Sequence, residues 1–179
     1  MTKRRAPRGT LAVQALERAG VPFTLHPYEP DPGDEGYGLA AARALGVDPG
    51  RVFKTLIASL TPAPGERAAT LVVAMVPVDR QLDLKALARA AGAKSASLAD
   101  PDLAERSTGY ILGGISPFGQ RQSLRAFIDD GALEAHLKTP IAGVAETVYV
   151  SAGRRGLQLE IGHQRLIDLT RAEAAPIAR

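Results

Sequence analysis

The sequence contains no cysteine and no tryptophan, and only 4% of its residues are aromatic. The absence of cysteine excludes disulfide bonds, cysteine nucleophiles, iron–sulfur clusters and thiolate zinc sites. No apolar run approaches the roughly 18 residues needed to span a bilayer. The N-terminus leads into amphipathic sequence and has no apolar core of the kind found in signal peptides, so we expect a cytoplasmic protein with no membrane partner.

The common signatures of nucleotide, metal and serine-hydrolase sites are also missing. Neither Gly-x-x-x-x-Gly-Lys-Ser/Thr nor Gly-x-Gly-x-x-Gly occurs, which argues against the common nucleotide-binding folds. The histidines at positions 26, 136 and 163 form no His-x-x-x-His pair, so we interpret them as surface or structural imidazoles. Ser116 does not fit Gly-x-Ser-x-Gly, because two residues separate it from Gly119. We therefore predict neither a metal nor a cofactor.

The composition that remains is that of an ordinary globular protein. The chain has 179 residues, 45% of them hydrophobic and 23% charged. A chain of this length buries roughly 70% of its unfolded surface, enough for one core without covalent staples. We expect one domain over residues 10–179, preceded by a flexible basic tail over residues 1–9.

The net charge is +3, and much of the excess lies in that tail, at Lys3, Arg4, Arg5 and Arg8. A positive tail suits a phosphate-rich partner, because each neutralised phosphate releases counterions. The alternative interpretation is a solvated terminal segment.

Apolar periodicity and capping residues predict interspersed helices and strands. Helices are expected over residues 10–19, 39–45, 84–91, 131–137 and 163–173, and another begins after Asp100. Strands are expected over residues 21–26, 52–58, 69–76, 124–128, 147–150 and 157–161, with a turn over 151–156. Since no regular βαβα repeat occurs, a mixed α+β sheet is favoured over a doubly wound parallel one.

Lys54 lies in the middle of an apolar strand and shares a strand face with Leu56 and Ala58. Burying an unpaired ammonium costs several kcal/mol, so this lysine should meet an anion, lose its proton or line a wet cavity. The alternative is an edge strand along which the lysine stem lies with its charge in solvent.

Residues 108–119 contain four glycines among apolar anchors. Glycine permits positive φ and close backbone approach, and successive free N–H groups bind a carboxylate, a carbonyl oxygen or a phosphate. A tight crossover between core elements is the alternative interpretation.

The order and spacing of several segments resemble the YbaK/EbsC family of aminoacyl-tRNA deacylases, which are related to the editing domain of bacterial prolyl-tRNA synthetases. The resemblance runs from about Leu11 to the last helix. It is carried by Val52-Phe53-Lys54-Thr55-Leu56, Gln81-Leu82-Asp83-Leu84-Lys85, Arg106-Ser107-Thr108-Gly109-Tyr110 and Gly113-Gly114-Ile115-Ser116-Pro117. The freestanding branch that removes cysteine from tRNA(Pro) is the most similar, through Tyr28-Glu29-Pro30-Asp31-Pro32 and Ser151-Ala152-Gly153-Arg154-Arg155-Gly156-Leu157.

This resemblance implies an α+β fold, with a mixed, partly barrel-like sheet flanked by helices. It implies that Lys54 corresponds to the lysine that is essential in the family. It also implies that the backbone amides of the Gly-x-x-x-Pro loop, here Gly113 to Pro117, hold the substrate near its reactive carbonyl. The substrate-binding residues that it implies are Tyr28, Tyr37, Gly113, Gly114, Ile115, Ser116, Pro117, Ser151 and Gln158. Two of them depart from the expected pattern, because Tyr37 stands where the cysteine-specific branch usually has phenylalanine, and Gln158 stands where aspartate is common.

The reaction implied by the resemblance is hydrolysis of mischarged Cys-tRNA(Pro), assisted by the thiol of the substrate. N–H donors from Gly114 to Ser116 are candidates to stabilise the oxyanion, a type of contact worth about 3 kcal/mol per donor. Lys54 has three possible roles: it neutralises a phosphate, orients the ester or stabilises developing charge. The alternatives for the whole protein are a deacylase for alanine or another small residue, and a non-catalytic module that binds tRNA or a synthetase.

The partners implied are mischarged tRNA(Pro) and, transiently, prolyl-tRNA synthetase, with no DNA and with the monomer as the default state. Lys3, Arg4, Arg5, Arg154 and Arg155 are the candidates for contacts with tRNA phosphates.

We predict that tRNA binding weakens steeply with salt and that deletion of residues 1–9 flattens this dependence, because fewer counterions are released. Filter binding of both proteins over a salt series measures the two slopes. Equal slopes would refute a role for the tail.

Overall fold

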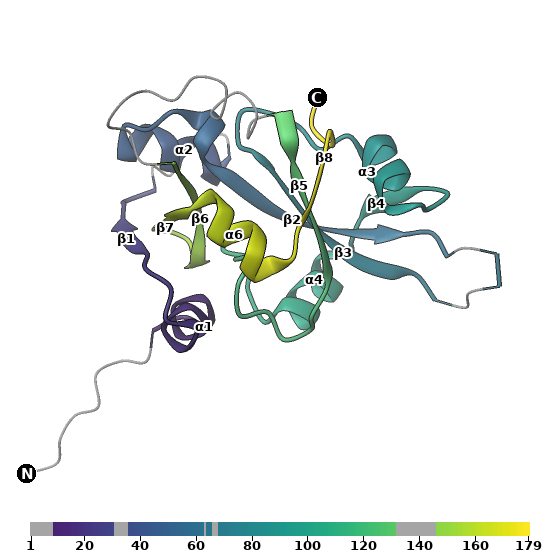
Figure 1. Ribbon diagram of the computed structural model, residues 1–179, viewed down its shortest axis with the longest axis horizontal. Coiled ribbons are helices and arrows are strands. Elements are labelled where there is room, and N and C mark those ends of the chain that lie inside the picture. Colours follow the sequence, from purple (N-terminus) through teal and green to yellow (C-terminus); the bar gives the residue numbers. More distant parts are fainter. Residues whose placement is uncertain (1–8, 31–35, 63, 66–67, 132–145) are drawn as a thin grey trace, which may run out of the picture.

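The computed structural model describes residues 9–30, 36–62, 64–65, 68–131 and 146–179. These form two separate β-sheets with helices packed around them (Figure 1). The helices are α1 (Leu11–Ala19), α2 (Tyr37–Leu45), α3 (Leu84–Ala91), α4 (Pro101–Thr108) and α6 (His163–Thr170), with a 3₁₀ turn η1 (Pro49–Arg51). The strands are β1 (Thr24–Pro27), β2 (Phe53–Leu60), β3 (Thr70–Pro77), β4 (Ala96–Leu98), β5 (Arg125–Asp129), β6 (Thr147–Arg154), β7 (Leu157–Gly162) and β8 (Glu173–Ala175).

The mixed α+β class predicted from the sequence is confirmed, but the sheets do not close into a barrel. One sheet has the strand order β4-β2-β3-β5-β8 and the other β1-β7-β6. Strand β5 pairs in parallel with β3 and β8, whereas the remaining ladders are antiparallel. In Figure 1 the smaller sheet lies on the left, and the β2–β3 hairpin extends to the right.

Helices α1, α3 and α4 each begin directly after the capping residue that the sequence indicates. Thr10, Asp83 and Asp100 each accept a hydrogen bond from a backbone N–H in the first turn of the following helix. Gly20 and Gly92 end their helices in the left-handed conformation. These boundaries follow from local chemistry, which is why the sequence predicts them well.

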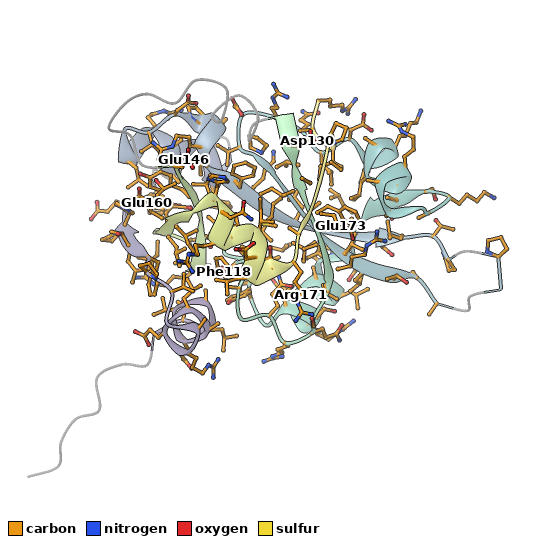
Figure 2. The ribbon with its side chains drawn as sticks, viewed as in Figure 1. Phe118, Asp130, Glu146, Glu160, Arg171 and Glu173 are labelled. Atoms are coloured by element: carbon orange, nitrogen blue, oxygen red, sulfur yellow. The ribbon has the colours of Figure 1, made fainter. Side chains whose placement is uncertain are left out.

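The boundaries that differ depend on distant contacts. The predicted helix over 163–173 ends at Thr170, where Arg171 adopts φ 53°, and Glu173–Ala175 then pairs with β5 (Figure 2). The turn expected over 151–156 is shorter, because β6 continues to Arg154 through a register shift after Ser151. Strand β1 covers residues 24–27 and not 21–26, and β4 was not predicted. The helix expected over 131–137 lies outside the described residues except at its first position.

Two layers of core residues lie on either side of the five-stranded sheet. Between this sheet and the three-stranded one lie Phe53, Met75, Ile128 and Leu159, together with Leu16 of α1 and Leu166 of α6. The opposite face is covered by α3, whose Leu87 packs with Val72, Phe127 and Ile177. Of the described helices, none is long and apolar enough to cross a membrane.

A polar network joins the two sheets where β2 begins. Val52 forms a parallel bridge with Tyr149 of β6, and the Arg51 guanidinium donates to the Thr147 carbonyl at 2.9 Å. Thr147 in turn donates to Glu160, which is labelled beside β1 in Figure 2. The start of β2 is therefore held against β6 by backbone and side-chain bonds.

We predict that Asp129→Ala lowers the free energy of unfolding by about 2–4 kcal/mol, because an unsatisfied buried donor costs about 1–3 kcal/mol. Asp129 is 1% exposed, and its Oδ1 accepts from the N–H groups of Ile177 at 3.0 Å and Ala178 at 2.8 Å. Urea unfolding measures the change, with the exposed Glu17→Ala as the control. Equal losses in both variants would contradict this role of Asp129.

Candidate active site

A cavity of about 650 Å³ runs along the N-terminal half of β2. Six consecutive residues, 52–57, line it. Successive strand residues point to opposite faces of a sheet, so a cavity that touches all six lies along the edge of the strand. Among the described residues, β4 pairs with Ala58–Leu60, the Ala99 N–H bonds to the Ile57 carbonyl, and β6 bridges only Val52, so the edge is open between these contacts.

The other walls of the cavity come from elements far apart in the sequence. The start of α2 lies on one side, and a Cβ at Gly38 would overlap Val78 of the turn after β3. The loop after α4 and the paired strands β6 and β7 complete the walls. Seven of the predicted site residues meet here: Tyr28, Tyr37, Lys54, Gly113, Ile115, Ser151 and Gln158.

Lys54 is half-buried in this cavity, and its Nζ donates to the Arg80 carbonyl oxygen at 2.6 Å. Burial lowers the pKa of Lys54, and the nearby negative charge of Asp79 opposes this shift. The lysine therefore lines a cavity and lies near the carboxylate of Asp79, and an anion near the ammonium is one of the environments expected for a charge within an apolar strand.

The glycine-rich loop presents only part of its backbone to the cavity. The N–H of Gly114 bonds to the Ile111 carbonyl at 2.9 Å and so is not free for a substrate. The N–H of Ile115, which lines the cavity, has no hydrogen-bond partner among the described residues. Of the three donors proposed from the sequence, Ile115 is thus the one whose residue reaches the cavity with its N–H unpaired.

Comparison with known proteins gives a consistent match. The model of the aminoacyl-tRNA editing domain matches residues 39–169. A protein of Enterococcus faecalis, EbsC, is 30% identical over 177 residues, which cover 99% of this chain and 98% of that protein. Its name describes it as a candidate Cys-tRNA(Pro)/Cys-tRNA(Cys) deacylase.

The chain belongs to the aminoacyl-tRNA editing domain family. The resemblance stated from the sequence is therefore confirmed, and with it the substrate class, an aminoacylated tRNA, and the reaction class, deacylation.

Solved structures show the same fold as this editing domain. A crystal structure described as a candidate trans-editing enzyme for prolyl-tRNA synthetase has a TM-score of 0.73 at 24% identity, covering 94% of this chain and 95% of that one. A second crystal structure, of a hypothetical protein, has a TM-score of 0.73 at 22% identity, covering 94% and 99%.

Three predicted site residues of the editing domain lie behind the cavity wall. Gly114, Ser116 and Pro117 are not among the lining residues. Ser116 is fully buried, and its Oγ accepts from the Phe118 N–H. Beside it, burial raises the pKa of Tyr110, whose hydroxyl donates to the Phe118 carbonyl. These contacts hold the loop in shape.

The predicted tRNA contacts are divided between two regions. Lys3, Arg4 and Arg5 lie outside the described residues. Arg154 and Arg155 are exposed at the β6–β7 turn, where Arg155 contacts Tyr37 and the glycine-rich loop.

Sequence reasoning missed two residues of the editing site. Thr55 is 8% exposed and Gln158 is 7% exposed. In the part of the chain that the structure describes, neither Thr55 Oγ1 nor Gln158 Oε1 has a hydrogen-bond partner. Asp79 was also missed, although it lies in the cavity and acts on the charge of Lys54. The signal for Thr55 was a hydroxyl directly after a lysine in an otherwise apolar strand.

No group of three or more His, Asp or Glu side chains is placed to hold a metal ion in the described ranges.

We predict that the pKa of Lys54 lies below the ordinary lysine value of 10.5 and that Asp79→Asn lowers it further, because the carboxylate favours the ammonium. The charged form exists below the pKa and is lost as pH rises through it, so a function that needs this charge fails at lower pH than for a solvated lysine. An NMR titration of the Lys54 Cε signal, assigned with Lys54→Arg, measures both values. A higher pKa in Asp79→Asn would contradict the proposed influence of Asp79.

Proposed function

We propose that this editing domain hydrolyses cysteine from mischarged tRNA(Pro). The observation that carries the proposal is that Thr55 and Gln158 line the cavity beside Lys54, while their buried Oγ1 and Oε1 atoms have no hydrogen-bond partner among the described residues. A buried polar atom without a hydrogen bond costs about 1–3 kcal/mol, so such atoms indicate a site that a polar ligand completes. The cavity volume lies within the range of about 300–1,000 Å³ typical of small-molecule sites.

The relatives support the choice of substrate. EbsC carries the two deacylase activities in its name, and one similar structure is described as a trans-editing enzyme for prolyl-tRNA synthetase. By this analogy we propose that the synthetase is a transient partner, which presents the mischarged tRNA to a monomeric editing domain.

The cavity supports substrate assistance because it holds no evident protein nucleophile with a base. The described residues that line it include no histidine, and the Ser151 hydroxyl accepts a hydrogen bond from the Gly153 N–H at 3.2 Å. Serine is a weak nucleophile unless a neighbouring base takes its proton. We therefore assign the attack to the cysteine thiol of the substrate.

In the proposed reaction the thiol sulfur attacks its own ester carbonyl carbon. A C–S bond forms, the C–O bond to the terminal ribose breaks, and the thiol proton passes to the leaving ribose oxygen. Water then opens the cyclic thioester and releases cysteine. The protein supplies geometry, which converts the attack into a favoured intramolecular step.

The developing charge on the carbonyl oxygen is stabilised, in this proposal, by the Lys54 ammonium and the Ile115 N–H. Both are positioned before the reaction, Lys54 by its bond to the Arg80 carbonyl and Ile115 by the loop turn. Donors fixed in advance are effective because they need no reorganisation as charge appears.

Selectivity follows from the same chemistry. Alanine has no thiol and cannot attack its own ester, so it escapes cleavage even if it enters the cavity. This supplements the limited discrimination that binding one small side chain allows.

We predict that the wild-type protein deacylates Cys-tRNA(Pro) and leaves Ala-tRNA(Pro) and S-methylcysteinyl-tRNA(Pro) intact, because both controls lack a free thiol. Lys54→Ala reduces the rate by about 10²–10³-fold, the loss typical for removal of an oxyanion contact. Time courses of released amino acid measure both effects. Lys94→Ala, at an exposed lysine, is the matched control.

Different outcomes would overturn different parts of the proposal. Cleavage of S-methylcysteinyl-tRNA(Pro) would exclude thiol assistance. Cleavage of Ala-tRNA(Pro) would leave a deacylase of other specificity, with Tyr37→Phe and Gln158→Asp as the next variants. Binding of tRNA without release of any amino acid would favour a non-catalytic module.

A further inference from the structure

Arg155, in the turn between β6 and β7, contacts two walls of the cavity at once. Its guanidinium carbon lies 4.1 Å from the centre of the Tyr37 ring, and its Nη2 donates to the Leu112 carbonyl oxygen at 2.9 Å. Tyr37 begins α2 and Leu112 belongs to the glycine-rich loop, and both line the cavity. One side chain therefore links the turn, the helix and the loop.

The backbone N–H and the carbonyl of Leu112 each form a hydrogen bond with a charged side chain. Its N–H donates to Glu105 Oε1 of α4 at 2.9 Å, while its carbonyl accepts from Arg155. Both bonds involve a charged partner, which makes them stronger than bonds between neutral groups. They fix the orientation of the backbone three residues before Ile115.

The loop also packs directly against the turn, which leaves no space for side chains. A Cβ at Gly113 would lie 2.6 Å from Arg155 Nε and 3.0 Å from the Tyr37 ring, and the φ of Gly113 is +85°. A Cβ at Gly114 would lie 2.9 Å from the Arg154 Cα. The two glycines are thus required by this contact as well as by the loop conformation.

The same turn holds a third cavity residue. The N–H of Tyr28 donates to the Gly156 carbonyl at 2.9 Å. The β6–β7 turn therefore places Tyr28, Tyr37 and the glycine-rich loop around one opening.

We propose that Arg155 is a positioning residue for the deacylation site: it fixes the glycine-rich loop and Tyr37 so that the Ile115 N–H meets the reacting carbonyl. This inference rests on the proposed function. It differs from the phosphate contact expected from the sequence, because the guanidinium stacks on Tyr37 and one of its N–H groups bonds to Leu112. Lysine cannot substitute, since it lacks the planar group that stacks and donates at the same time.

The test compares Arg155→Ala and Arg155→Lys on Cys-tRNA(Pro) and on 3′-O-cysteinyl adenosine, which has no phosphate. We expect both variants to lower kcat by about 10–100-fold on both substrates with little change in KM, since a misplacement of 1 Å costs on the order of 10²-fold. Arg18→Ala, at an exposed arginine on α1, is the control. Glu105→Ala should act in the same direction, and Glu105→Gln should restore activity because its amide oxygen still accepts from Leu112.

A phosphate contact gives the opposite pattern and would overturn the proposal. In that case Arg155→Lys would behave like wild type, and Arg155→Ala would raise KM on tRNA in a salt-dependent way without affecting cysteinyl adenosine. Hydrogen exchange at the Leu112 and Gly113 amides gives a readout that does not depend on activity. Faster exchange in both Arg155 variants, with unchanged urea midpoints, supports positioning even if the proposed substrate is wrong, whereas unchanged exchange would refute it.

Discussion

The open edge of β2 is the constraint on which the site depends. Strand β3 pairs with the whole length of β2 on one side. On the other side, among the described residues, β6 bridges Val52 just before β2, the Ala99 N–H bonds to the Ile57 carbonyl, and β4 pairs from Ala58 onward. An unpaired strand edge presents a row of backbone donors and acceptors. The cavity occupies the interval between these two partners, so the lengths of β4 and of the β6 bridge set its extent.

Three polar side chains that line the cavity, Lys54, Thr55 and Gln158, differ in whether the protein itself satisfies their hydrogen-bonding groups. Lys54 bonds to a backbone carbonyl and lies near a carboxylate, so its charge is partly compensated within the protein. The buried oxygens of Thr55 and Gln158 have no such compensation. The site thus combines one fixed charge with unsatisfied neutral groups, an arrangement suited to a polar ligand that enters and leaves.

The sequence predicted those parts of the molecule that local chemistry determines. The caps at Thr10, Asp83 and Asp100 bond within their own first turns, so their helices were placed to within about a residue. The end of α6 and strand β8 were not predicted, because pairing with β5 decides them. The resemblance brought together the right segments around Lys54, but it could not show that the Gly114 N–H is used within the loop or that Ser116 faces the interior. The sequence shows the Thr55 hydroxyl beside Lys54 in an apolar strand, but only the structure shows that its Oγ1 is buried without a partner among the described residues.

The open edge has a consequence for the behaviour of the protein in solution. Unpaired edges invite strand addition by other chains, and natural sheets discourage it with charged side chains, lysine above all. Lys54 lies on the open stretch of β2, inside the cavity, where its ammonium donates to the Arg80 carbonyl. The cavity walls formed by α2, the glycine-rich loop and strands β6 and β7 therefore cover a strand edge that would otherwise be available for pairing with another chain.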